Sequence, residues 1–188
     1  MNDDAGRPDD PAGGQARSTG EQARATGASW FGGRQDAGPG TDAGQSTQAR
    51  TLEQRYADAI AAMNRVISTL QFDDLPWITE VFRATAGVLD ERDPSRAGVL
   101  NNLGSASQLA YVDSKQVGDL EDAVGYYRDA SNSARQDDPD LVLYLCNLAL
   151  ALTDLAILSG QARHAEEGVR AARTAVEQTP RRDPRRVI

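Results

Sequence analysis

Cys146 and His164 are the only cysteine and the only histidine in the sequence, and these two residue types often form a nucleophile and its base. The pattern places Cys146 midway along one predicted helix and His164 at the start of the next. Neither comes with a glycine-rich turn or an oxyanion-hole loop. We therefore expect Cys146 to be a small, partly buried apolar residue, and we expect the chain not to be an enzyme.

Neighbouring carboxylates are the second candidate for chemistry, and they occur at Asp73-Asp74, Glu121-Asp122 and Glu166-Glu167. Each pair falls near the predicted start of a helix, where the helix dipole favours acidic side chains. The sequence contains no HExxH motif, no EF-hand loop and no phosphate-binding glycine motif. A single cysteine allows neither an internal disulfide nor a thiolate metal cluster. The sequence therefore predicts no metal site and no cofactor.

The charge of the chain argues against a nucleic-acid partner. The net charge is -8 over 188 residues, and an acidic body repels phosphate backbones. Only the last residues are basic, with Arg181, Arg182, Arg185 and Arg186, and a solvated basic end is the simplest interpretation of such a short run.

The first fifty residues have the composition of a disordered tail. They contain ten of the seventeen glycines, and Trp30 and Phe31 are their only large apolar side chains. Such a segment cannot bury enough apolar surface to offset the entropy of ordering it. Trp30-Phe31 is either a short docking motif or a chance apolar pair.

One apolar segment, Leu141 to Gly160, has the length of a membrane span. Asn147 and Asp154 lie inside it, and an Asp near the centre of a span costs roughly 2.5 to 3.5 kcal/mol. The segment also repeats an ordinary amphipathic helix found earlier in the chain, so we predict no membrane contact. The N-terminus, Met1 to Asp4, has no signal-peptide pattern, and cytoplasmic localisation is the default expectation.

The sequence contains an internal repeat, which indicates where the helices that carry these residues begin. Asp93-Pro94, Asp138-Pro139 and Asp183-Pro184 are spaced by 45 residues. Each pair resembles a helix start, in which Asp is the N-cap and Pro takes the first helical position. Internal repeats of this length are typical of stacked helical units.

The residues between these starts align under the same shift. Leu100 to Gly104 matches Leu145 to Ala149, and Gly118 and Gly160 are expected in the turns between paired helices. Asp119 is the expected cap of the helix that follows Gly118. Asp58 falls where Leu103 would be, which suggests that the register of the first unit has slipped.

The predicted fold is all-α, with three helix pairs at about 51–70 with 75–90, 95–113 with 119–134, and 139–158 with 163–178. The domain covers 51–188 and follows the tail of residues 1–50. Its units span about 51–92, 93–137 and 138–182, and a fourth starts at 183. Because a helical hairpin cannot cover its own apolar face, we expect the hairpins to stack into a right-handed solenoid.

The pattern of small and large side chains along these units resembles that of tetratricopeptide repeats. The matching residues are Leu100, Leu103, Gly104, Ala123, Tyr127 and Ala130, then Leu145, Leu148, Ala149, Gly168, Ala172 and Ala175. The spacing exceeds the family's usual length of about 34 residues. It is similar to the long bacterial repeats that precede caspase-like CHAT protease domains. The extra residues are expected in turns at 111–118 and 136–138.

The resemblance implies a scaffold that binds another protein or peptide in a concave groove formed by the first helix of each pair. The expected groove residues are Asn101, Asn102, Ser105 and Gln108, with Cys146, Asn147, Leu150 and Asp154. Asn102 and Asn147 match the asparagine with which several peptide-binding members hold a ligand's main chain. Alternatively, these two amides satisfy a neighbouring helix.

Two functions from different classes remain open on the sequence alone. The first is a stand-alone adaptor, and the second is the recruitment arm of a larger CHAT-protease-like sensor. Asp183 to Ile188 begins a fourth unit without completing it, so the C-terminal face of the array is expected to lack a cap. Either a partner or self-association would cover that face, or the chain is a fragment.

Overall fold

The computed structural model describes residues 43–179, with side chains described from Thr51 onward. Every regular element in this range is a helix and none is a strand, which confirms the all-α prediction. The helices are α2 (Ala43–Thr69), α3 (Leu75–Val88), α4 (Arg96–Ser114), α5 (Val117–Ser133), α6 (Leu141–Ser159) and α7 (Ala162–Gln178). The remaining residues, which include Trp30-Phe31 and the C-terminal arginines, lie outside this description.

The 45-residue period of the sequence is present in the helix boundaries. The last four helices form two pairs, and both ends of α6 and α7 lie 45 residues after those of α4 and α5. α2 ends 45 residues before α4, but it begins at Ala43, eight residues earlier than the predicted helix. The six predicted helices are therefore confirmed to within a few residues, apart from that earlier start.

The turns inside the pairs repeat as well. Leu70, Lys115 and Gly160 follow the first helix of each pair, and all three adopt left-handed backbone conformations, with φ of 54°, 56° and 66°. Gly160 was expected at a turn, but Gly118 lies inside α5 instead. The α4–α5 connection is only two residues long because α4 continues to Ser114. The extra length expected at 111–118 is therefore mostly helix.

The Asp-Pro pairs precede the helices rather than cap them. α4 and α6 begin three residues after Asp93 and Asp138, with Ser95 and Asp140 at the N-cap positions. The Asp93 carboxylate accepts a hydrogen bond from the Ser95 amide at 2.9 Å, and Asp138 accepts one from Asp140 at 2.8 Å. Aspartate commonly closes a turn in this way, by accepting from the amide two residues on, which here is the amide of the N-cap residue. Likewise Asp119 lies in the first turn of α5, after the N-cap.

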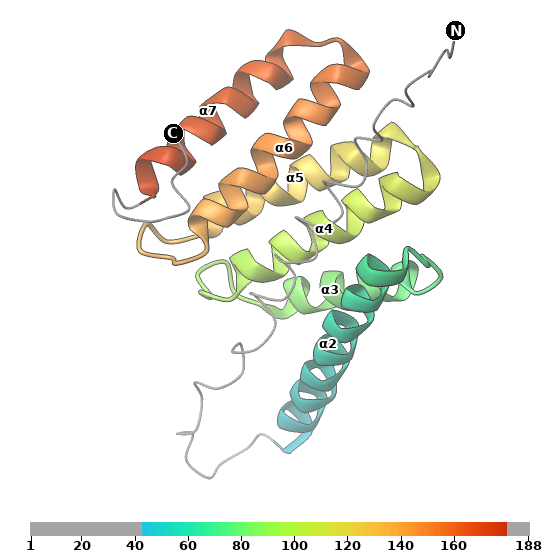
Figure 1. The fold of residues 1–188 in the computed structure, drawn as a ribbon. Helices are drawn as coiled ribbons and strands as arrows, with labels where there is room; N and C mark the ends of the chain where they lie inside the picture. The colour runs from blue at the N-terminus through green and yellow to red at the C-terminus, as the bar shows by residue number, and fades with distance from the viewer. Residues whose placement is uncertain (1–42, 180–188) are drawn as a thin grey trace, which may run out of the picture.

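Helices adjacent in sequence pack against one another, from α2 to α7 in order. Figure 1 shows α2 and α3 at one end of the molecule and α6 and α7 at the other. Side-chain bonds also join alternate helices, since Tyr56 of α2 contacts Asn102 of α4, and Arg128 of α5 contacts Glu167 of α7. The first helices of the pairs therefore lie next to one another, and α5 and α7 do likewise.

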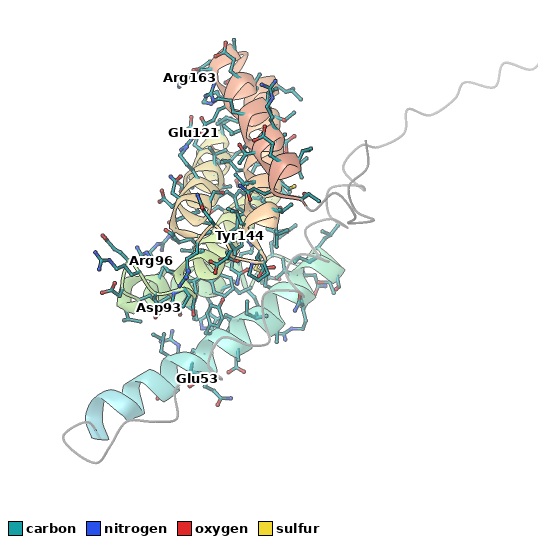
Figure 2. The ribbon with its side chains drawn as sticks, turned by 90° about the vertical axis from the view of Figure 1, so that its left-hand side faces the viewer. Glu53, Asp93, Arg96, Glu121, Tyr144 and Arg163 are labelled. Carbon is teal, nitrogen blue, oxygen red and sulfur yellow. The ribbon has the colours of Figure 1, made fainter. Side chains whose placement is uncertain are left out.

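Arg96 fixes the step from one pair to the next. Its guanidinium donates to the carbonyl oxygens of Ala86 at 2.7 Å and Leu89 at 3.0 Å, at the C-terminal end of α3. Cations favour helix C-termini, where backbone carbonyls have no partner within the helix. Figure 2 shows Arg96 close to Asp93 at the start of α4.

The core has two apolar clusters. One joins α2, α3 and α4 through side chains such as Met63, Phe82 and Leu103, and the other joins α5, α6 and α7 through Leu120 and Leu152. At about 25 cal/mol per Å² of buried apolar surface, such clusters supply most of the stabilisation.

The slipped register predicted at Asp58 is wrong. α2 keeps the register of α4, and Asp58 is exposed where its counterpart Leu103 is buried. The difference arises because Leu103 packs in one cluster with α2 and α3 of the preceding hairpin, whereas no described hairpin precedes α2. Asp58 thus lies in the first hairpin of the described residues, on a side that the described part of the chain leaves exposed.

Candidate functional site

Two buried amides join each helix pair to the one before it. The Asn102 Nδ2 donates to the Tyr56 hydroxyl at 2.8 Å, and the Asn147 Nδ2 donates to Asn101 Oδ1 at 2.8 Å. Each bond spans 46 residues, and both asparagines are at most 3% exposed. These contacts favour the alternative in which the asparagines satisfy a neighbouring helix.

Burial also affects the phenol that receives the first of these bonds. Desolvation raises the pKa of Tyr56 to about 12, although the hydrogen bond from Asn102 lowers this pKa by a smaller amount. The hydroxyl therefore stays protonated at neutral pH. It accepts from Asn102 as part of the packing between α2 and α4.

Ser105 and Gln108 face the inside of their own hairpin. The Tyr127 hydroxyl of α5 donates to Gln108 Oε1 at 3.0 Å and lies 3.1 Å from Ser105 Oγ. Ser105 in turn donates to the Asn101 carbonyl oxygen at 3.1 Å. Burial raises the pKa of Tyr127, so this hydroxyl also stays protonated. Ser105 is buried and Gln108 is half-buried.

The remaining expected groove residues lie on α6. Cys146 and Asp154 are half-buried, and Leu150 is 45% exposed. Of the seven polar residues expected to line a groove, four are thus buried in helix contacts. Only Gln108, Cys146 and Asp154 retain partial exposure.

Cys146 and His164 are not arranged as a catalytic pair. Cys146 lies 13 residues before the end of α6, and His164 lies in the first turn of α7, so the two are separated by roughly 16 Å along the hairpin. Burial raises the pKa of the Cys146 thiol, which disfavours the thiolate that a nucleophile needs. Among residues 51–179, no group of three or more His, Cys, Asp or Glu side chains is placed to hold a metal ion.

An exposed apolar surface on the last hairpin is the most distinctive feature of the described chain. We call it the terminal face, and it comprises Cys146, Leu150, Ala165, Val169, Ala172 and Val176. Val169 is 59% exposed and Val176 is 51% exposed. On α7 these residues follow the spacing of one helical stripe, at i, i+4, i+7 and i+11.

The middle hairpin shows what normally lies on such a surface. The positions 45 residues earlier are Asn101, Ser105, Leu120, Val124, Tyr127 and Ser131. The first five are buried, and Ser131 is half-buried. Leu120, Val124 and Tyr127 pack in one cluster with Leu148 and Leu152 of α6. The same surface is therefore covered by the next hairpin in the middle unit and open in the last.

An ion pair strengthens this covered interface. The Arg128 guanidinium donates to both carboxylate oxygens of Glu167, at 2.8 Å and 3.1 Å. The hydrogen bond from Arg128 holds the pKa of Glu167 below its usual range. Arg173, the counterpart of Arg128 on α7, lies exposed at the edge of the terminal face.

α6 is the one helix in the described part of the chain with the length and apolar composition of a membrane span. Its buried side, which includes Leu148, Leu152 and Leu155, packs against α5 and α7. These contacts bury 39% of its apolar window, while Leu150, Ile157 and Leu158 are exposed.

No protein-family model, curated protein or solved structure matches the chain. The function is therefore inferred from the geometry of the helices and of the terminal face.

Proposed function

We propose that the chain is a protein-interaction scaffold, a right-handed solenoid of tetratricopeptide-like hairpins that binds a helical partner on its terminal face. The observation that carries the proposal is the exposure of Val169, whose counterpart Val124 is 3% exposed in a cluster with Leu148 and Leu152 of the next hairpin. On the neighbouring helix α6, Leu150 is 45% exposed. Exposed apolar side chains gathered on one side of a helix are typical of interaction sites.

The arrangement of the hairpins supports a helical ligand. α6 already packs on the equivalent surface of α5, so the α7 side of the terminal face has the spacing that accepts a packed helix. Binding would bury the exposed half of Leu150, Val169 and Val176. Since fully burying a side chain of this size contributes about 1.5 to 3 kcal/mol, each would contribute roughly half of that. The proposal includes no catalytic step, cofactor or metal, and it places the protein in the cytoplasm.

This site differs from the groove that the family resemblance implies. Asn102 and Asn147 would have to leave their partners Tyr56 and Asn101 before they could bind a peptide. Breaking buried hydrogen bonds costs about 1 to 3 kcal/mol each. The terminal face needs no such rearrangement and is therefore the preferred site.

Affinity capture tests the proposal, with the full chain as bait in lysate of the source cell. Leu150→Glu and Val169→Glu place charges on the terminal face, while Val88→Glu is a matched control on α3, where Val88 is 70% exposed. We expect the same partner with wild type and the control, and its loss with both terminal-face variants. Equal capture by all four proteins would contradict the proposal.

A second candidate function, the recruitment arm of a larger CHAT-protease-like protein, draws on the same surface. A further hairpin of the same polypeptide would cover the terminal face just as α6 and α7 cover the middle hairpin. Sequencing the transcript beyond the codon for Ile188 tests this candidate. Codons for another 45-residue unit would favour it, and a stop codon would exclude it.

A further inference from the structure

We propose that a second copy of this chain covers the terminal face, in a two-fold symmetric dimer in which the α7 helices of the two copies lie antiparallel. This inference rests on the proposed function, whose partner it names. Three observations support it: the polarity of the opposite end, the distribution of charge, and the order of charged residues along α7.

The opposite end of the described array is polar at positions where the terminal face would have to dock. On α4, Val99 and Leu103 are buried in one cluster with residues of α2 and α3 of the preceding hairpin. The equivalent positions on α2 are Gln54 and Asp58, which are exposed. Head-to-tail association would bury this polar surface against apolar side chains, at a cost in desolvation. A symmetric contact instead places the same apolar surface on both sides.

The charge distribution favours the same contact. Residues 51–140 carry 16 acidic and 8 basic side chains, whereas residues 141–179 carry four acidic and three basic side chains. The last hairpin is therefore nearly neutral, and the repulsive charge lies elsewhere. A dimer through the terminal faces keeps the two acidic regions apart, so their repulsion is weakened by distance and salt.

The charged residues beside the stripe on α7 are self-complementary. Glu166 and Arg173 are exposed and seven residues apart, so they lie on the same flank of the apolar stripe. No ion pair within the described residues includes either side chain. When two identical helices pack antiparallel, each flank meets the same flank of its partner, with the residue order reversed. Glu166 of each copy then lies near Arg173 of the other, which gives two equivalent ion pairs.

The full chain allows a direct test by sedimentation velocity across the micromolar range. We expect wild type and Val88→Glu to form dimers, and Leu150→Glu and Val169→Glu to be monomers with unchanged helical content by circular dichroism. Glu166→Arg and Arg173→Glu should each weaken the dimer about tenfold, because each places two like-charge contacts in the symmetric interface.

Mixing the last two variants is the decisive step. A heterodimer of Glu166→Arg with Arg173→Glu pairs opposite charges at both contacts, so the mixture should regain wild-type dimerisation. Failure of the mixture to recover would overturn the antiparallel arrangement. A dimer that withstands both Leu150→Glu and Val169→Glu would overturn the use of the terminal face.

Two other results would replace the second copy with a different occupant. A monomeric wild type that captures another protein through Leu150 and Val169 would overturn the dimer and leave the proposed scaffold standing. A monomeric wild type that instead co-sediments with vesicles of phosphatidylcholine and phosphatidylserine in equal parts would overturn the dimer in favour of a lipid surface. A monomer whose capture is unaffected by the terminal-face variants would remove both proposals.

Discussion

The Asn147 side-chain amide donates to Asn101 Oδ1 at 2.8 Å and so joins α6 to α4 inside the protein. Asn102 makes the corresponding bond to Tyr56, again 46 residues upstream. Asn102 and Asn147, which are one repeat apart, therefore each link a hairpin to the one before it. The two acceptors, Tyr56 and Asn101, are also 45 residues apart. The next equivalent position is Cys146, which lies on the terminal face.

Asn147→Ala should lower the free energy of unfolding by about 1 to 3 kcal/mol, because it leaves the buried Asn101 Oδ1 without this donor. Urea denaturation followed by circular dichroism measures the change. Asn132→Ala, at an exposed position on α5, is the control and should cost much less. In a double-mutant cycle, Asn101→Ala combined with Asn147→Ala should cost less than the sum of the single changes.

The groove expectation makes the opposite prediction for the same residues. If Asn102 and Asn147 held a ligand, replacing both with Ala would weaken partner binding and leave folding intact. We expect the double variant to lose stability first. A fully stable double variant with reduced binding would restore the groove as the binding site.

Gly104→Ala should destabilise the protein by about 1 to 3 kcal/mol through overpacking. A Cβ at this position would lie 2.6 Å from Cδ1 of the Tyr127 ring, which is fully buried and cannot easily move. Gly125→Ala on α5 is the control, because its Cβ would meet nothing within 4 Å. The control should stabilise the helix by up to about 1 kcal/mol. In thermal denaturation, the midpoint should fall for Gly104→Ala and rise for Gly125→Ala, each relative to wild type.

Lys115→Gly should stabilise the protein by about 0.5 to 1 kcal/mol, because Lys115 holds a φ of 56° that glycine adopts without steric cost. Loss of the contact between the Lys115 ammonium and the Tyr111 ring, at 5.9 Å, offsets part of the gain. Gly160→Ala, at the equivalent turn, should destabilise. Chemical denaturation of both variants checks the signs, and destabilisation by Lys115→Gly would contradict this account of the turn.

Glu167→Gln should reduce stability near neutral pH by about 0.5 to 1 kcal/mol, since the ion pair with Arg128 is partly exposed. The folded state lowers the pKa of Glu167, so its contribution is present above the ordinary glutamate range. That contribution is lost as the pH falls through the lowered pKa. The difference in free energy of unfolding between wild type and Glu167→Gln should therefore disappear in acid. A gap that widens on acidification would rule out this role for Glu167.

The sequence predicted the helices well because their signals are local. Apolar spacing and the 45-residue shift placed α4 to α7 to within a few residues. The Asp-Pro pairs correctly marked the approach to a helix. However, residue types alone could not show whether the Asp is the N-cap itself or closes a turn two residues before the N-cap. Lys115 at a left-handed turn has no sequence signal of its own, and only its spacing from Gly160 could have identified it.

The orientation of each polar residue was decided by tertiary packing alone. Asn102, Asn147 and Asp58 are all polar residues on a first helix, yet the two asparagines are buried and the aspartate is exposed. The difference depends on whether another helix packs against that side, and contacts between residues 46 positions apart leave no mark in local periodicity. Sequence by itself determined where the helices and turns lie. Packing decided which polar side chains became buried and which stayed exposed, because burial depends on neighbours that only the folded chain brings together.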